Sequence, residues 1–298
     1  MLTQDQIEFF QTNGYLHLHG VLDAREVEAM RRAADELAEQ GRRDGEDPAR
    51  VVEMRRARAD WIEHPETHLV YEDDGCGGVR FHRAERMWTK QPIFREVTLN
   101  PTVLEAVSSL LGGVPFWPRG GSLVYKTPGH GAAVPWHQDI PYYWRRTVAD
   151  VPRPRAQTYP TPNFTTDFYL EASRGEEGGV WCVPGTHRQG SVDIDTMVKE
   201  HGFRLPGAIP LEAEAGDVLF HHVAVLHGSD RNTSSHLRRT FYQHYMTDDV
   251  MRDAYSDWPD MKNDNENAAF WAAALESRAQ AGFATSGAVG IGLHGMTA

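Results

Sequence analysis

From Ser122 to Tyr245 the sequence consists of short runs of strand-forming residues separated by glycine and proline, and this pattern limits the fold more than any other feature. Such runs occupy residues 122–126, 134–140, 163–170, 179–184, 217–222 and 239–245. No clear helical periodicity lies between them. Short strands at such intervals are typical of a sandwich or of a closed double-sheet architecture. We therefore expect a mainly β core.

Helical patterns precede this region. Thr3 begins a capping-box-like stretch that predicts a short helix ending near Asn13-Gly14, and residues 15–19 alternate as a strand. A second helix is predicted after Asp23, because apolar residues recur at helical spacing as far as Leu37.

The other flanking segments are less regular. Residues 41–75 are charged and irregular in pattern, so we expect a long surface segment there, helical in part. A packing helix is predicted within 93–111, with Pro101 near a helix start, and another helix over about 268–279.

Length and charge restrict the domain organisation and the partner. The 298 residues, 40% of them hydrophobic, fit one domain, which we expect over 1–298 with its β core at about 115–247. The net charge of −12 argues against a nucleic-acid or anionic-membrane surface and favours a small-molecule partner.

Cys76 and Cys182 have no paired spacing, so no disulfide framework or thiolate zinc site is indicated. With no signal-peptide or membrane-span pattern, we expect a soluble, cytoplasmic chain.

The stretch 135–141 places His137 and Asp139 in a run that reads as extended. Side chains two residues apart on a strand point to the same face, so this imidazole and carboxylate can bind one metal ion. They would supply two ligands of a 2-His-1-carboxylate site. The spacing alone has little weight, because 15 histidines and 42 acidic residues in 298 give roughly two such triplets by chance, and two occur. The other, His64-Pro65-Glu66, is interpreted as a solvated loop.

Three histidines compete for the third ligand position. His221 and His222 are adjacent at the end of a predicted strand and should point to opposite faces. His227 is followed by Gly228-Ser229, a turn that could leave its ring facing a cavity. We predict His227 as the ligand; the alternative is a hydrogen-bonded core histidine.

A pair of arginines follows on the next strand. A strand-borne Arg238 could grip a carboxylate through a bidentate fork, and Ser229 could donate its hydroxyl to the same anion. Arg238 and Arg239 should lie on opposite faces, so one of them is expected to point inward. Lys126 is a further candidate for contact with the same anion, although a lysine at a strand end is more often exposed.

Two smaller questions concern the neighbouring strands. The pattern leaves open which face of the strand at 163–170 lines the metal site: Asn163, Thr165, Asp167 and Tyr169 share one face, and Thr166 and Phe168 share the other. His187 follows a turn and is interpreted as structural rather than as a ligand.

The segment 141–162 leaves the metal strand directly and has no periodic pattern. It carries three consecutive aromatic residues and four arginines in an otherwise acidic protein. Long irregular segments in compact domains are usually functional lids or disordered loops. We expect a substrate-selecting lid, with Tyr143 and Trp144 on an apolar or ring-bearing substrate and Arg146 on an anionic group; a solvated loop is the alternative.

Taken in order, these motifs resemble the phytanoyl-CoA dioxygenase family of Fe(II)/2-oxoglutarate-dependent oxygenases. The resemblance covers roughly residues 3–247 and rests on Asn13-Gly14-Tyr15, Trp136-His137-Gln138-Asp139, the stretch from Gly178-Gly179-Val180 to Pro184-Gly185-Thr186-His187, Gly216-Asp217, His227-Gly228-Ser229, Asn232 and Arg238-Arg239. It implies an α+β, mainly β fold: a double-stranded β-helix, or jelly roll, with flanking helices. It also implies Fe(II) on His137, Asp139 and His227, and 2-oxoglutarate with its distal carboxylate on Arg238.

The resemblance further implies that O2 oxidises a small molecule while 2-oxoglutarate is converted to succinate and CO2. Hydroxylation is the expected outcome; desaturation, epoxidation and ring formation stay open, as do the substrate and the oligomeric state. A zinc hydrolase could use two histidines and an aspartate, but it would leave the paired arginines unexplained. The intact triad argues against a jelly-roll binding protein without catalysis.

Overall fold

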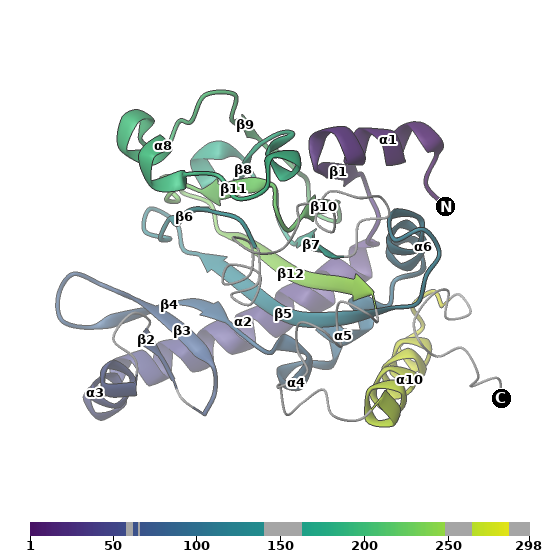
Figure 1. The fold of residues 1–298 in the computed structure, drawn as a ribbon. Helices are drawn as coiled ribbons and strands as arrows, with labels where there is room; N and C mark the ends of the chain where they lie inside the picture. The colour runs from purple at the N-terminus through teal and green to yellow at the C-terminus, as the bar shows by residue number, and fades with distance from the viewer. Residues whose placement is uncertain (58–61, 65, 140–162, 248–263, 286–298) are drawn as a thin grey trace.

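The computed structural model describes residues 1–57, 62–64, 66–139, 163–247 and 264–285, and its strands form two antiparallel sheets (Figure 1). The larger sheet has eight strands in the order β1 (Tyr15–Leu18), β10 (Val218–His222), β7 (Asn163–Tyr169), β12 (Arg238–Thr247), β5 (Phe116–Lys126), β4 (Val79–Ala84), β3 (Leu69–Asp73) and β2 (Ile62–Glu63). The smaller sheet has four, in the order β6 (Val134–His137), β11 (Leu226–Ser229), β8 (Val180–Val183) and β9 (Ile209–Pro210). The predicted double-sheet core is therefore present.

The helices lie mainly around the larger sheet (Figure 1). They are α1 (Gln4–Asn13), α2 (Ala24–Glu46), α3 (Pro48–Ala57), α4 (Met87–Lys90), α5 (Pro92–Thr98), α6 (Pro101–Leu110), α8 (Ile194–His201) and α10 (Asp264–Gln280), with 3-10 turns η1 (Gly175–Glu177) and η2 (Thr186–Gln189). Two capping boxes fix the N-terminal helices: Thr3 pairs with Gln6 at α1, and Asp23 pairs with Glu26 at α2. No helix in the described ranges is long and apolar enough to cross a membrane.

Two sequence predictions about the flanking segments need correction. The described part of residues 41–75 contains the expected helical part, in the end of α2 and in α3, but also the edge strands β2 and β3, which the pattern did not predict. Charged residues on the exposed faces of these elements hide the apolar pattern, although β3 buries Leu69, Val70 and Tyr71. Residues 93–111 form two helices, because Asn100 caps a new helix with Pro101 at its first position.

Close packing of α2 on the larger sheet requires glycine at position 41. A Cβ atom at Gly41 would lie 2.7 Å from a ring carbon of Phe81 on β4, which is closer than real side chains approach. The same helix is tied to β12 by Arg239, which pairs with Asp35 at 2.5 Å. These contacts explain why the larger sheet carries its helical layer on this face.

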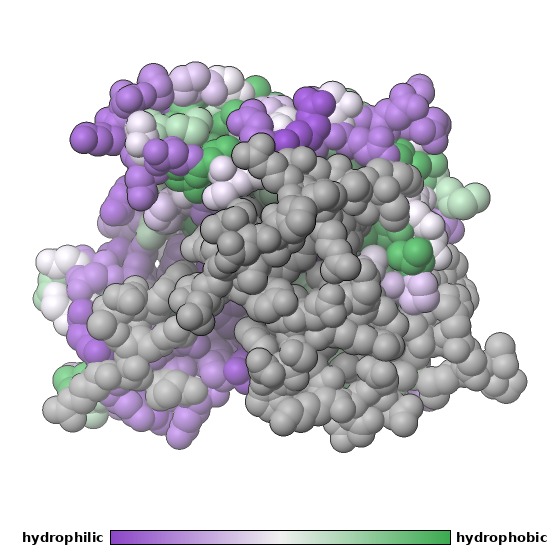
Figure 2. Space-filling view, viewed as in Figure 1, coloured by the Kyte–Doolittle hydropathy of each residue, from purple (hydrophilic) through white to green (hydrophobic). Residues whose placement is uncertain are grey.

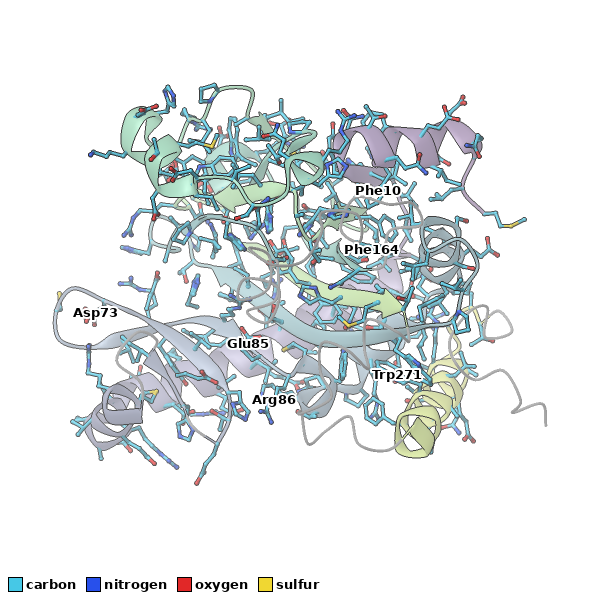
Figure 3. All side chains as sticks on the ribbon, in the orientation of Figure 1. Phe10, Asp73, Glu85, Arg86, Phe164 and Trp271 are labelled. Atoms are coloured by element: carbon cyan, nitrogen blue, oxygen red, sulfur yellow. The ribbon has the colours of Figure 1, made fainter. Side chains whose placement is uncertain are left out.

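One face of β7 belongs to the hydrophobic core. Phe10 of α1 and Phe164 of β7 point toward one another with ring centroids 6.0 Å apart (Figure 3), and Phe168 packs on Phe241 at 5.4 Å. Outside the core, the helices α1 and α8 present mostly hydrophilic surface (Figure 2). Because neighbouring strand residues alternate, the other face of β7 must point toward the smaller sheet.

The C-terminal helix α10 is held by a buried ion pair. Arg278 lies 2.7 Å from Glu26 of α2, with the two side chains 1% and 3% exposed. Trp271 of the same helix is also buried and meets Trp88 edge-on at 5.0 Å. The C-terminal helix is thus packed against the N-terminal part of the chain.

Candidate active site

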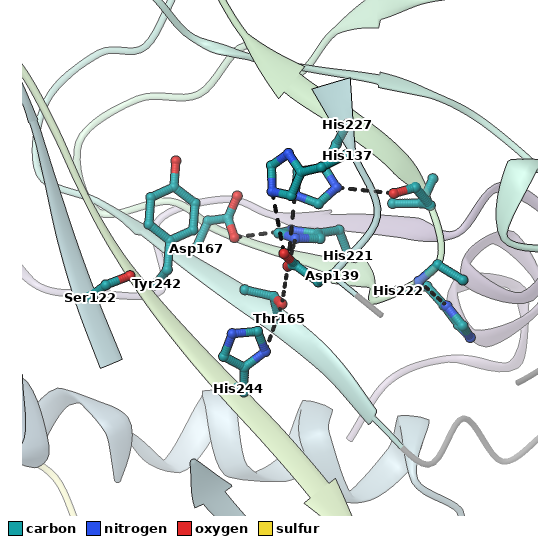
Figure 4. Close-up of polar contacts among 12 residues, drawn as sticks. Ser122, His137, Asp139, Thr165, Asp167, His221, His222, His227, Tyr242 and His244 are labelled. Atoms are coloured by element: carbon teal, nitrogen blue, oxygen red, sulfur yellow. Dashed lines mark hydrogen bonds and ion pairs between the residues drawn. The ribbon is translucent and has the colours of Figure 1, made fainter. Parts of the chain in front are cut away.

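The three predicted metal ligands come together between the two sheets (Figure 4). His137 at the end of β6 is the direct cross-strand partner of His227 on β11, and Asp139 lies two residues beyond His137. One donor atom from each residue lies within 4.8 Å of the others. Nε2 of His137 is 3.3 Å from Asp139 Oδ1, and Nε2 of His227 is 3.7 Å from Asp139 Oδ2. This arrangement matches a 2-His-1-carboxylate donor set.

The strand ends differ from the prediction in two respects. β6 stops at His137 rather than continuing through Asp139, and residues 140–162 lie outside the described ranges. Gly228-Ser229 is not a turn but part of β11, which pairs with β6 on one side and β8 on the other. His227 therefore faces the cavity because of strand alternation rather than a turn.

Backbone carbonyls fix the tautomers of both imidazoles. Nδ1 of His137 lies 2.8 Å from the carbonyl of Pro135, and Nδ1 of His227 lies 3.0 Å from the carbonyl of Val225. A carbonyl only accepts, so each Nδ1 must carry the proton, which leaves each Nε2 lone pair available to a metal ion. Burial, reinforced by the charges of His137 and His221, holds the pKa of His227 well below its usual value. A neutral imidazole is the form that binds metal.

Asp139 is oriented by two donors. Thr165 on β7 donates its hydroxyl to Asp139 Oδ2 at 3.0 Å, and His221 on β10 lies 3.4 Å from the same oxygen. Burial alone would raise the pKa of Asp139, but the neighbouring histidines, first His227 and then His137 and His221, lower it well below its usual value. The carboxylate is therefore ionised at neutral pH.

The two histidines that competed with His227 point to opposite faces of β10, as predicted. His221 faces the metal cluster, where its ring centroid is 4.4 Å from that of His227. His222 faces away and its Nδ1 accepts a hydrogen bond from the Ala224 amide at 2.9 Å. The polar face of β7 is also settled, because Thr165 and Asp167 contact Asp139 and His221 respectively.

Of the two arginines, Arg238 points inward. Its side chain is completely buried; Nη2 donates to the Tyr242 hydroxyl at 2.9 Å and Nε to Ser173 Oγ at 3.4 Å. Nη1 has no hydrogen-bond partner among the described residues. A buried guanidinium nitrogen without a partner is costly, and a bound carboxylate would satisfy it. Arg239 points to the other face, where it pairs with Glu171 at 2.5 Å.

Lys126 is buried rather than exposed, contrary to the sequence expectation. It is the cross-strand partner of Arg238, and its Nζ donates to Ser229 Oγ at 2.7 Å and to the Asp230 carbonyl at 2.5 Å. Burial, followed by the charge of Arg238, lowers the pKa of Lys126 to about 6. Lys126, Ser229 and Arg238 together form a compact group of donors suited to a carboxylate.

A cavity at the metal cluster is lined by the three proposed ligands and by Ser229 of the donor group. Tyr242, whose hydroxyl accepts a hydrogen bond from Arg238, also lines it. The cavity lining also includes residues that no sequence pattern marked as functional: Arg83, Ser122, Val124, Val134, Val180, Tyr242 and His244. Arg83 reaches it from β4 and donates to Ser122 Oγ at 3.1 Å. Strand alternation could have found Tyr242, which lies on the same face of β12 as Arg238. The others come from strands whose mutual register the sequence does not reveal.

The remaining predictions have separate outcomes. His187 is structural, because it is buried and its Nε2 lies 3.0 Å from the Gln11 carbonyl. His64 does not lie in a solvated loop: it is 1% exposed, and its Nδ1 accepts from the amides of Glu66 and Thr67, both at 3.2 Å. The predicted lid residues Tyr143, Trp144 and Arg146 lie outside the described residues.

Residues 10–240 match the family described as Phytanoyl-CoA dioxygenase (PhyH). The chain belongs to the phytanoyl-CoA dioxygenase family. Phytanoyl-CoA dioxygenase 1 from Oryza sativa subsp. japonica is 26% identical over 275 residues, which cover 82% of this chain and 88% of that protein. The predicted family and the dioxygenase class are therefore confirmed.

Solved structures with the same fold support the jelly-roll prediction. EctD from S. alaskensis, solved with 2-oxoglutarate and 5-hydroxyectoine, matches with a TM-score of 0.59 at 17% identity. The match covers 83% of this chain and 76% of the EctD chain. The non-heme alpha ketoglutarate dependent carbocyclase SnoK from nogalamycin biosynthesis has a TM-score of 0.57 at 22% identity, covering 83% and 84%. The predicted fold is confirmed, and so is the cofactor chemistry of iron, 2-oxoglutarate and O2 that this family uses.

Proposed function

We propose that this protein hydroxylates a small molecule in a reaction that depends on Fe(II) and 2-oxoglutarate and releases succinate and CO2. The observation that carries the proposal is a 2-His-1-carboxylate cluster in a cavity that Ser229 and Tyr242 also line. The buried Arg238 donates to Tyr242 and has a second nitrogen that lacks a partner among the described residues. A 2-oxo acid that binds a metal at one end carries its second carboxylate at the other. The chain offers matching groups for both ends.

The proposed roles follow from the contacts. His137, Asp139 and His227 would hold the iron. The two histidines direct Nδ1–H to backbone carbonyls, so each would offer Nε2, and Asp139 would offer a carboxylate oxygen. Arg238 and Ser229 would bind the distal carboxylate of 2-oxoglutarate, with Lys126 beside them. Iron with 2-oxoglutarate would supply the oxidising chemistry with O2; the protein binds, orients and shields the reactants.

Proteins with this fold differ in what they act on: one is a carbocyclase, and another was solved with 5-hydroxyectoine. The fold therefore does not identify the substrate of this protein. Desaturation, epoxidation and cyclisation therefore remain alternatives to hydroxylation. Selection by Tyr143, Trp144 and Arg146 stays a prediction. Arg83, which lines the cavity, is a described candidate for contact with a polar group of the substrate.

The test uses the full-length protein loaded anaerobically with Fe(II) and 2-oxoglutarate. We expect a visible charge-transfer absorption from the metal-bound 2-oxo acid, and slow succinate release once O2 is admitted. Asp139→Ala and His227→Ala should lose both signals. The matched control is His236→Ala, an exposed histidine that lies 3.5 Å from Glu177 and outside the cluster.

Two outcomes would reject the proposal. Hydrolysis supported by Zn²⁺, without succinate formation, would indicate a metal hydrolase. Binding of neither Fe(II) nor 2-oxoglutarate by the wild-type protein would indicate a jelly-roll protein without catalysis.

A further inference from the structure

A second group of metal-binding side chains lies outside the active site, where β1 meets β10. His17 belongs to β1, His19 follows the end of that strand, and Asp217 precedes β10. Nε2 of His17 lies 2.9 Å from Asp217 Oδ2, and Nδ1 of His19 lies 3.2 Å from the same oxygen. Two imidazole nitrogens from residues i and i+2 thus converge on one carboxylate oxygen.

The carboxylate is held in place by the backbone. The Gly20 amide donates to Asp217 Oδ1 at 2.8 Å, and the Glu214 amide donates to Oδ2 at 3.0 Å. The side chain of Asp217 is only 5% exposed, whereas that of His19 is 78% exposed. One ligand is therefore rigid and buried, while the opposite side of the group is open to an ion and to water.

The spacing of the donors suits a transition-metal ion. Zinc–nitrogen and zinc–oxygen bonds of about 2.1 Å place tetrahedral ligand atoms roughly 3.4 Å apart. The observed separations of 2.9 and 3.2 Å would need to open by only about half an ångström or less to reach that spacing. The two rings are also close, with centroids 4.1 Å apart.

We propose that His17, His19 and Asp217 form a second metal site, selective for zinc-like divalent ions that bind imidazole and carboxylate ligands. The ion would cross-link β1 to β10. In the described part of the chain β1 has only β10 as a strand partner, so such a cross-link would hold the N-terminal segment on the edge of the larger sheet. The proposal does not depend on the reaction at the active site.

The experiment measures Zn²⁺ binding to metal-free full-length protein that carries His227→Ala, so that the active-site cluster lacks a ligand. Calorimetry or competition with a chromophoric chelator should find one tightly bound Zn²⁺ per chain. Adding His19→Ala should weaken this binding by at least about a hundredfold, because one of three protein ligands is lost. Zn²⁺ should also raise the Tm of the first protein and not that of the second.

Two further variants separate metal binding from hydrogen bonding. His17→Gln keeps an amide donor for Asp217 but removes the imidazole, so it should fold normally and still lose Zn²⁺ binding. His236→Ala is the control, since its ring is 74% exposed and lies near a single carboxylate without a second imidazole; it should bind Zn²⁺ unchanged. Equal Zn²⁺ affinity with and without His19, or retention of the ion by His17→Gln, would overturn the proposal and leave Asp217 as a hydrogen-bond acceptor only.

Discussion

The carboxylate of Asp167 lies 3.1 Å from Nδ1 of His221, and both side chains are buried (Figure 4). The other ring nitrogen of His221 lies 3.4 Å from Asp139 Oδ2, so this histidine connects a core carboxylate to a proposed iron ligand. Burial alone would lower the pKa of His221, but Asp167 and Asp139 raise it to about 10. An imidazolium donates from both nitrogens, which suits a position between two carboxylates.

Replacing His221 should therefore weaken the metal site without removing a ligand. His221→Ala frees one side of Asp139 Oδ2, and loss of such an outer hydrogen bond typically costs about 10- to 100-fold in metal affinity. We expect weaker Fe(II) binding and more 2-oxoglutarate turned over per oxidised product. His221→Gln, which keeps a donor, should recover part of the affinity. Unchanged Fe(II) affinity in the alanine variant would mean that Thr165 alone orients Asp139.

Substitutions of the two arginines of β12 should have different effects: one on the binding of 2-oxoglutarate, the other on the stability of the fold. Arg238→Lys keeps the charge but removes the planar fork. Losing a charge-assisted hydrogen bond of about 1.5–3 kcal/mol should raise the KM for 2-oxoglutarate by roughly 10- to 100-fold, with less effect on the primary substrate. The control is Arg239→Lys, which weakens pairing with Glu171 and should lower Tm while leaving this KM unchanged. The reverse pattern would show that Arg239 is the anion-binding residue.

The affinity for 2-oxoglutarate should fall as the pH rises. Because the pKa of Lys126 is lowered to about 6, its amine is neutral in the free protein above that pH and must take up a proton when it pairs with a dianion. Linkage then predicts a Kd that increases by up to about tenfold per pH unit from about pH 6 to about pH 8. Lys126→Met should bind more weakly and show a flat profile. An equally steep profile in the methionine variant would assign the proton to another group.

Arg83 should act on the substrate rather than on 2-oxoglutarate. Its side chain lines the cavity and donates to Ser122, whereas the proposed donors to 2-oxoglutarate are grouped around Arg238. With Arg83→Ala we expect uncoupled succinate formation to continue while stimulation by the true substrate falls by about tenfold or more, as for a lost hydrogen bond to a charged group. Steady-state succinate assays with and without substrate make the comparison. Full stimulation in this variant would place selection elsewhere.

The buried pair between Arg278 and Glu26 should contribute to stability alone. Removing one partner of a buried ion pair typically costs about 3–5 kcal/mol, because the other charge stays buried and unpaired. Arg278→Met should therefore lower the free energy of unfolding by about that amount, measured by urea denaturation, with the KM for 2-oxoglutarate unchanged. A double variant with Glu26→Gln should recover part of the loss. Additive losses would argue against direct coupling of the two side chains.

Local spacing in the sequence determined much of the site. The two-residue period of a strand places His137 and Asp139 on one face, separates His221 from His222, and separates Arg238 from Arg239. Glycine and proline residues at the ends of short runs predicted six strands of the core, and the capping residues Thr3 and Asp23 predicted the starts of the first two helices. These features depend on neighbours in the chain, so the sequence carries them directly.

Only the tertiary structure decided which of these faces point inward. The face of β7 that lines the site depends on the pairing of β7 with β10 and β12, and the burial of Lys126 depends on its register with Arg238. The link from Asp167 through His221 to Asp139 joins three separate segments of the chain. Contacts of this kind are fixed by strand register and by packing between sheets, and a pattern along one chain does not contain either.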